Sequence, residues 1–360
     1  MKMTRRGSFS YPNESAGCAN IFRTMSLVSS NVKRKQIGVY IPAWLLRTSP
    51  STKMFWTAFL RSLKQHNLHP VFVNLPQLHL SSERDVLAFL RTTPLQAFVC
   101  HDSHLYERNA RYTNNVRLLE SHIRFFNKEN AHRAGYDKCL TKEQLRAQGL
   151  PVLPDVLCSS AHEVLEALKI GEWFVIKPPN AGGGAGVFLV RHKEGVVYVH
   201  HKGTWYQADI TNEQHKRKPR IRFTFRSSFF PTTFWYEHVL VEPYFNDEGV
   251  GFKSLRATVV GATVVESVER VNMHSITSNV SQGGKACVVT LTDEQERMAQ
   301  DACRAIDADY AGVDFLVSEG KTVVGEINIG PFTTYNVYTK KDTGEALARY
   351  IAQEMKTAQG

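Results

Sequence analysis

Strands and helices alternate between residues 36 and 125, and this order constrains the fold more than any other feature of the chain. The apolar run QIGVYIPAWL is typical of a strand, and residues 51–66 after it place apolar side chains on one helical face. The alternation continues as strand, helix and strand at Pro70–Leu75, Glu83–Arg91 and Leu95–Cys100. Because strands joined through helices run parallel, residues 36–125 predict a small parallel α/β domain.

The rest of the chain predicts two further lobes. Residues 126–240 hold a helix at 137–148, the strand WFVIKP, a glycine-rich loop and the strand GVFLV. Residues 241–360 hold three successive strands, a helix, two more strands and a final helix. Thr292 and Gln295 have the spacing of a capping box at the start of the first of these helices. At about 150 residues per domain, 360 residues accommodate this division.

The net charge of +10 is concentrated in two segments. Residues 1–35 carry +6 and residues 214–236 carry another +6, which leaves the remaining body at −2. A near-neutral body argues against nucleic acid as a partner, although attraction of a polyanion by the basic segments stays open. No apolar run approaches the ~20 residues that span a bilayer, so no membrane partner is expected.

Six scattered cysteines, with no CxxC pair and no metal-ligand spacing, are typical of a reduced, intracellular protein. A cytoplasmic location is therefore expected. Residues 1–35 are rich in Ser and Arg and poor in acids, as transit peptides are. We interpret them as a disordered basic leader or as sequence upstream of a true start near Met25, with organelle targeting as the alternative.

Aromatic and basic residues are interleaved in an insert at 193–236. Such a composition can bind single-stranded nucleic acid, with bases stacked on the aromatic rings. It can equally form β-hairpins whose aromatic side chains face inward. We favour hairpins, because aromatic residues are common in strands.

Four glycines, Gly182, Gly183, Gly184 and Gly186, lie between two strands in VIKPPNAGGGAGV. Glycine lets backbone N–H groups turn toward an anion and approach it closely, so phosphate is the natural ligand. Lys177 adds a positive charge at the end of the preceding strand. The loop is not a Walker A motif, because no GK[ST] opens a helix after it. A flexible turn is the alternative.

Three oxygen-bearing side chains occur in GVDFLV and in EIN: Asp314, Glu326 and Asn328. Residues two apart project from one face of a strand, so Glu326 and Asn328 are expected side by side, with Asp314 on the neighbouring strand. Mg²⁺ prefers oxygen ligands of this kind. A solvated strand end, with Asn328 as a turn residue, is the alternative.

Arg256 and Arg270 stand on consecutive strands of a predicted hairpin, and a polar loop with Asn279 follows. Beside a metal, two arginines could hold phosphate oxygens or a developing oxyanion. Pairing with Glu266 or Glu269 at the surface is the alternative.

Taken in order, these features resemble the ATP-grasp superfamily, and most closely its branch with bacterial glutathione synthetase and the ribosomal-protein glutamate ligases. The resemblance covers roughly residues 125–355. It rests on the following ordered set: Lys138, Lys177 with its loop, LVEPYF, Arg256, Arg270, SNVSQGG, GVDFLV and EIN. It implies an α/β (α+β) ATP-grasp fold, with an N-terminal parallel α/β domain and two lobes that clasp ATP.

The resemblance also implies contacts to ATP. Lys138 and Lys177 would hold the phosphates, Lys177 would also reach the adenine, and residues 180–186 would close over the phosphates as a lid. The expected adenine and ribose contacts come from the hinge: Glu242 and Tyr244 for the adenine, and Asp247 for the ribose.

On the reacting side, the resemblance implies two Mg²⁺ ions, for which Mn²⁺ could substitute. The implied metal ligands are Asp314, Glu326 and Asn328. The γ-phosphate or the acyl phosphate would be held by Arg256, Arg270 and Asn279. Two departures from the family's pattern leave the identity of the amine acceptor open. Ser254 stands where the family often has an acidic residue. After its Glu-x-Asn the family often has a small polar residue and Pro-Gly, where this chain reads EINIGPF.

The activity implied is the ligation of a carboxylate to an amine with release of ADP and phosphate. The carboxylate would attack the γ-phosphorus, and the acyl phosphate would then meet the amine. The partners would be a small-molecule or peptide carboxylate and an amine acceptor, and a homo-oligomer is left open. One alternative is a kinase of the same fold acting on a polyanion such as an inositol phosphate, suggested by the basic segment 216–226. The other is a non-catalytic nucleotide-binding module.

Overall fold

The computed structural model describes most of the chain after residue 34. The described ranges are 35–41, 50–100, 109–168, 173–181, 186–201, 204–215, 218–226, 232–247, 252–273, 276–280, 283–330 and 335–357. Within these ranges, no helix combines the length and the apolar character needed to cross a membrane. The predicted basic leader and Gly182, Gly183 and Gly184 fall outside them.

A four-stranded parallel sheet of order β2-β1-β3-β4 begins the fold, as predicted. Its strands are β1 Lys35–Tyr40, β2 Leu68–Phe72, β3 Leu95–Cys100 and β4 Arg124–Phe126, and its helices are α3 Pro50–Gln65, α4 Glu83–Thr92 and α5 Ala110–Glu120. The strand predicted at 70–75 begins and ends earlier, because a 3-10 turn, η2 Leu75–Gln77, follows it. Helix α5 was not predicted, because polar Asn115 takes a buried position in it and interrupts the apolar period.

An eight-stranded antiparallel sheet of order β11-β10-β9-β8-β7-β6-β12-β5 forms the central lobe. Its strands are β5 Val156–Cys158, β6 Trp173–Lys177, β7 Phe188–Lys193, β8 Val196–His201, β9 Thr204–His215, β10 Lys218–Arg226, β11 Thr232–Tyr236 and β12 Val239–Pro243. The helices of this segment are α6 Glu129–Tyr136, α7 Lys138–Ala147 and α8 Ala161–Ala167. The insert therefore extends the sheet as antiparallel strands, and Phe223 and Phe225 face the core as predicted. Trp205 and Trp235, each 41% exposed, depart from that prediction.

A five-stranded antiparallel sheet of order β15-β14-β13-β16-β17 completes the fold. Its strands are β13 Phe252–Val260, β14 Thr263–Asn272, β15 Lys285–Val288, β16 Tyr310–Ser318 and β17 Lys321–Asn328, and its helices are α9 Asp293–Ala305, α10 Asn336–Thr339 and α11 Thr343–Thr357. The predicted capping box of Thr292 and Gln295 is present at α9. Gly261 turns the β13–β14 hairpin with φ +58°, a conformation that glycine adopts at little cost.

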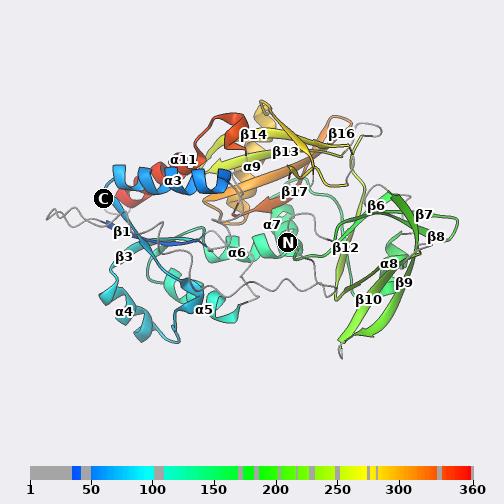
Figure 1. Ribbon diagram of the computed structural model, residues 1–360, viewed down its shortest axis with the longest axis horizontal. Coiled ribbons are helices and arrows are strands. Elements are labelled where there is room, and N and C mark those ends of the chain that lie inside the picture. The colour runs from blue at the N-terminus through cyan, green and yellow to red at the C-terminus, as the bar shows by residue number, and fades with distance from the viewer. Residues whose placement is uncertain are drawn as a thin grey trace.

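Helices α3 and α11 lie side by side between the first and last sheets (Figure 1). Phe55 and Phe59 of α3 share one buried cluster with Leu347 and Ile351 of α11. Helix α9 covers the opposite face of the last sheet and contributes Ala299 to a second buried cluster. The predicted domain boundaries at 125 and 240 stay predictions.

Candidate active site

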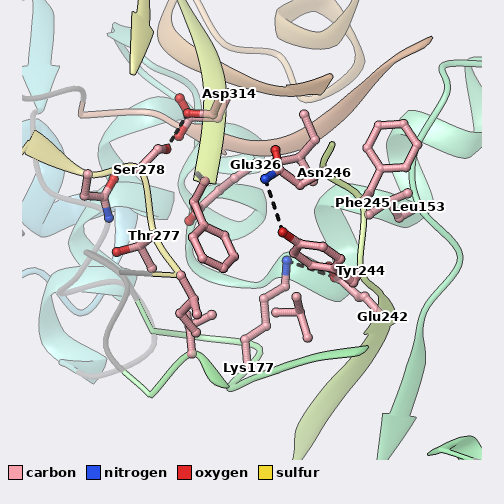
Figure 2. Close-up of a pocket in the computed structure, with 18 of the residues that line it drawn as sticks. Leu153, Lys177, Glu242, Tyr244, Phe245, Asn246, Thr277, Ser278, Asp314 and Glu326 are labelled. Carbon is pink, nitrogen blue, oxygen red and sulfur yellow. Dashed lines mark hydrogen bonds and ion pairs between the residues drawn. The ribbon is translucent and has the colours of Figure 1, made fainter. Parts of the chain in front are cut away.

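A cavity of about 170 Å³ lies between the central and C-terminal sheets. Figure 2 shows Lys177, Glu242 and Tyr244 of the central lobe along one part of it, with Asp314 and Ser278 across from them. The sequence-predicted residues that line the cavity are Lys138, Lys177, Glu242, Tyr244, Arg270, Asn279, Asp314 and Glu326. The fold therefore brings together residues that lie nearly two hundred positions apart in the chain.

Glu242 on β12 forms the base of a buried ion-pair network. Its Oε1 lies 2.6 Å from Lys142 Nζ and 2.9 Å from Lys177 Nζ, and Glu242 is only 3% exposed. Burial favours the neutral carboxyl, but the two ammonium groups outweigh it and lower the pKa of Glu242. Burial likewise opposes the charge of Lys177, yet Glu242 raises the pKa of that lysine.

Glu242 lines the cavity, as expected, but its carboxylate is paired with two lysines. Its contact with an adenine stays a prediction. Lys142 was missed from the sequence, and burial lowers its pKa. Its position relative to Lys138 could have identified it, because Lys142 lies four residues after Lys138 and therefore on the same face of α7.

An aromatic wall follows the hinge at the end of β12. Tyr244, Phe245 and Phe252 line the cavity, and the Tyr244 and Phe252 rings lie 5.8 Å apart. Asn246 Nδ2 donates a hydrogen bond to Tyr244 Oη at 3.1 Å, which fixes the phenol (Figure 2). Such a wall suits a flat, apolar ring system.

Asp247 is not among the residues that line the cavity, and its expected contact with the ribose stays a prediction. Its Oδ1 accepts hydrogen bonds from Ser318 Oγ at 2.9 Å and from the Glu319 backbone N–H at 2.8 Å. These bonds lower the pKa of Asp247, the backbone bond most. Asp247 therefore ties the chain after β12 to the turn between β16 and β17.

Lys138 connects the glycine-rich loop to the carboxylate side of the cavity. Its Nζ lies 3.3 Å from Glu326 Oε1 and also donates to the carbonyl of Ala181. Gly186, at the far end of the loop, has φ +72°, and a Cβ there would lie 2.9 Å from Tyr236 Oη. Only glycine fits this position without strain.

Asp314 on β16 is held by both predicted arginines. Its oxygens lie 2.6 Å from Arg256 Nε and Nη2, and 2.9 Å from Arg270 Nη2. Burial would raise the pKa of Asp314, but the two guanidinium groups lower it. The surface pairing of these arginines with Glu266 or Glu269 is therefore wrong. Arg256 is buried beneath Asp314 and is not among the residues that line the cavity.

Ser254 takes the place beside Arg270 where the family often has an acid. Its Oγ accepts from Arg270 Nε at 3.0 Å and Nη2 at 2.7 Å, and it lies 2.5 Å from Ser278 Oγ. A neutral hydroxyl leaves more of the charge of Arg270 available to an anion in the cavity than a carboxylate would.

The oxygen-bearing residues fit a magnesium ion that also binds phosphate. Asp314 and Glu326 are direct partners across β16 and β17, as predicted, and Asn328 donates to Asp314 Oδ2 at 3.3 Å. Mg²⁺ is commonly held by one or two carboxylates together with substrate phosphates. Within the described ranges, no group of three or more His, Cys, Asp and Glu side chains is arranged for a metal. The protein would thus supply two carboxylates and one amide.

The basic segment of the insert lies away from this site. Arg222 pairs with Glu213 at 3.3 Å, Arg226 pairs with Asp209 at 2.7 Å, and no basic residue that the structure describes between 218 and 226 lines the cavity. The described part of the segment that suggested a kinase of polyanions thus contributes no basic side chain to this cavity.

A cavity of this composition between the central and C-terminal sheets is typical of an ATP-grasp fold. A solved RimK domain ATP-grasp protein from Sphaerobacter thermophilus superposes with a TM-score of 0.56 at 14% sequence identity, over 88% of this chain and 99% of that one. Residues 231–352 match the RimK-like ATP-grasp domain, so the chain contains a domain of that family.

Two relatives in sequence carry glutamate ligase names. The tetrahydromethanopterin:alpha-L-glutamate ligase of Methanocaldococcus jannaschii is 26% identical over 216 residues, which are 60% of this chain and 65% of that protein. The ribosomal protein bS6–L-glutamate ligase of Escherichia fergusonii is 36% identical over 95 residues, which are 26% of this chain and 31% of that protein. The chain thus spans less than two thirds of the length of each relative.

Proposed function

We propose that this protein is an ATP-dependent, ADP-forming ligase that joins a carboxylate to an amine through an acyl phosphate. The observation that carries the proposal is the convergence of two lysines, an arginine and two carboxylates in one cavity: Lys138, Lys177, Arg270, Asp314 and Glu326. Cations there would neutralise a triphosphate, and carboxylates would hold its metal. The RimK-like domain and the glutamate ligase relatives support the same reaction class.

Each wall of the cavity has a proposed task. Tyr244 and Phe252 pack against the adenine, while Lys138 and Lys177 hold phosphates. Arg270 and Asn279 bind the acyl phosphate and then the oxyanion of the tetrahedral intermediate, an effect worth about 3 kcal/mol per donor. Arg256 is a positioning residue, because it is buried and acts through Asp314.

Asp314, Glu326 and Asn328 are the proposed holders of magnesium. When bound, Mg²⁺ would offset the negative charge on the transferred phosphoryl group. The loop after Lys177 would exclude water, which otherwise hydrolyses an acyl phosphate. We propose a cytoplasmic setting and, as the resemblance implies, two Mg²⁺ ions with substitution by Mn²⁺.

L-Glutamate is the first amine to test. Both relatives described above are named for ligation of L-glutamate, one to a pterin and one to a ribosomal protein. The carboxylate partner would then be a small molecule or a peptide.

The reaction class is tested by ADP release in the presence of MgATP with panels of acids and amines. We expect ADP only when both an acid and an amine are present, and we expect hydroxylamine to replace the amine and yield a hydroxamate. A phosphorylated hydroxyl product, or ADP release independent of any acid, would contradict the proposal. Glu326→Gln serves as the low-activity control, because its side chain is 35% exposed and its replacement should leave the fold intact.

A further inference from the structure

The insert strands present a second, exposed face beside the one that packs on α8. Strand side chains alternate, so β10 buries Ile221, Phe223 and Phe225 and turns Arg222 and Arg226 the other way. On β9 and β11 the same outer face carries Trp205 and Trp235, both 41% exposed. Core packing does not explain this face.

The exposed face continues the wall of the nucleotide cavity. On β6, Trp173 lies on the same side as Val175 and Lys177, and the latter two line the cavity. Across the sheet, the register places Trp173 beside Arg191 and Arg191 beside Tyr198. Figure 1 shows β6 to β10 as one continuous sheet, so a molecule on the insert could extend into the cavity without leaving this side.

A chain of ring contacts marks the path. The Trp205 ring lies 5.5 Å from the Trp173 ring, and Trp173 lies 6.3 Å from Tyr244 of the cavity wall. The Arg191 guanidinium lies over the Trp173 ring, 5.1 Å from its centroid, in a cation–π arrangement that restrains the arginine side chain. We call the surface formed by Trp173, Arg191, Tyr198, Trp205, Arg226 and Trp235 the Trp205 face.

The chemistry of the Trp205 face favours a polypeptide. Trp, Tyr and Arg are the residues that most often dominate protein–protein interfaces. Asp209 and Glu213 are interspersed with the arginines and pair with them, so the face has no continuous cationic track of the kind that follows a nucleic-acid backbone. Yet residues 191–236 contain nine Lys and Arg against three Asp and Glu, so the segment stays strongly positive. A net acidic chain with aromatic residues complements both properties.

We propose that the Trp205 face docks an acidic polypeptide that carries the group to be ligated. The polypeptide would lie across β6 to β10, with acidic side chains near Arg191 and Arg226 and an apolar or aromatic side chain against Trp205. Its reactive end would run past Trp173 along β6 toward Lys177, on the phosphate side of the cavity. The docking stands on the face itself, whereas the delivery of a reactive group rests on the proposed ligase function.

Binding without turnover tests the docking. Fluorescence anisotropy would follow the full chain binding a fluorescein-labelled random copolymer of glutamate and tyrosine, with labelled oligouridylate as the second probe. The test variant is Trp205→Ala with Arg226→Gln. The matched control is Leu157→Ala with Arg304→Gln. Leu157 is 49% exposed at the opposite edge of the same sheet, and Arg304 is 64% exposed and paired with an aspartate, as Arg226 is.

We expect the copolymer to bind the unaltered protein in a salt-sensitive way, and its Kd to rise about tenfold or more in the test variant but less than about twofold in the control. Arg226→Glu alone gives the same test if the double variant does not fold. Absence of copolymer binding, or an equal loss in both variants, overturns the proposal. Preferred binding of oligouridylate that the test variant loses would assign the face to nucleic acid instead. Hydroxamate formation with small acids reports separately on the ligase function.

Discussion

Replacing Glu242 with glutamine tests the buried network that orders the cavity. The substitution keeps the size and most hydrogen-bonding capacity of the side chain but removes its charge. Lys142 and Lys177 would then remain in contact with a neutral amide, and both are close to the same atom, Glu242 Oε1. Two ammonium groups would share a buried site in which Asp155, 3.8 Å from Lys142 Nζ, is the nearest remaining counter-charge.

The exposed fractions of the three side chains decide how much stability Glu242→Gln should lose. The side chains of Glu242, Lys142 and Lys177 are 4%, 4% and 13% exposed, so solvent cannot replace the missing charge. Removing one partner of such a buried pair typically costs about 3–5 kcal/mol, whereas an exposed pair contributes at most about 1 kcal/mol. We therefore expect Glu242→Gln to lower the free energy of unfolding by about 3 kcal/mol or more.

The pH dependence has a defined sign. The folded protein lowers the pKa of Glu242 from its ordinary value of 4.5, so its stabilising contribution is fully present above pH 4.5. That contribution is lost as pH falls through the lowered pKa, where the folded protein must also take up the proton. The difference in stability between the two proteins should thus be largest near neutral pH and should shrink below pH 4.5.

Urea unfolding followed by circular dichroism, at neutral and at acid pH, measures both effects. Glu194→Gln is the matched control, because Glu194 is 83% exposed and its nearest cation, Lys193, lies 3.8 Å away. We expect the control to change stability by less than about 0.5 kcal/mol. A loss for Glu242→Gln as small as that of the control, or one that grows at acid pH, would refute the argument from burial.

Four further substitutions separate structural from chemical roles. Asp314→Asn should lower both the activity and, by about 3 kcal/mol, the free energy of unfolding. The reason is that Arg256 and Arg270 would stay buried without the carboxylate that pairs with them. Urea unfolding measures the loss of stability. Glu326→Gln should instead unfold like the unaltered protein while ADP release falls by about 10- to 100-fold, the range seen when partners of a metal site are removed. Gly186→Ala should lower the thermal midpoint, since φ is +72° there and Tyr236 Oη leaves no room for a Cβ. Thr292→Ala should cost about 1 kcal/mol in urea unfolding through loss of the capping box.

Local patterns predicted most of the longer strands, though not β4, β5 or β15, and the juxtaposition of the metal-binding candidates. Strand alternation placed Glu326 and Asn328 on one face, and β16 and β17 are indeed neighbours with Asp314 opposite Glu326. The turn at Gly261 and the cap at Thr292 also follow from nearby residues alone. Features of this kind are specified within a few residues, so one sequence is enough to find them.

Which acidic side chain pairs with which arginine or lysine around the cavity could not be predicted in the same way. The sequence offered Glu266 and Glu269 as nearby acids for the arginines, but Arg256 pairs with Asp314, 58 positions away. Glu242 likewise binds Lys142, which is 100 positions away. Which acid meets which base depends on how three sheets pack, and a pattern within one strand contains no information on that.

The ion pairs of Asp314 also limit how the carboxylate of GVDFLV can bind a metal ion. Arg256, Arg270 and Asn328 already supply donors to both of its oxygens, and a carboxylate has about four lone-pair positions to offer. A magnesium ion can therefore bind Asp314 only where one of these donors gives way. Arg270 is the donor with a second acceptor at hand, because Ser254 Oγ also accepts from it, whereas Arg256 is buried with both of its bonds on Asp314. Since Arg270 lines the cavity as well, metal binding at Asp314 would turn this guanidinium toward the phosphate it is proposed to hold.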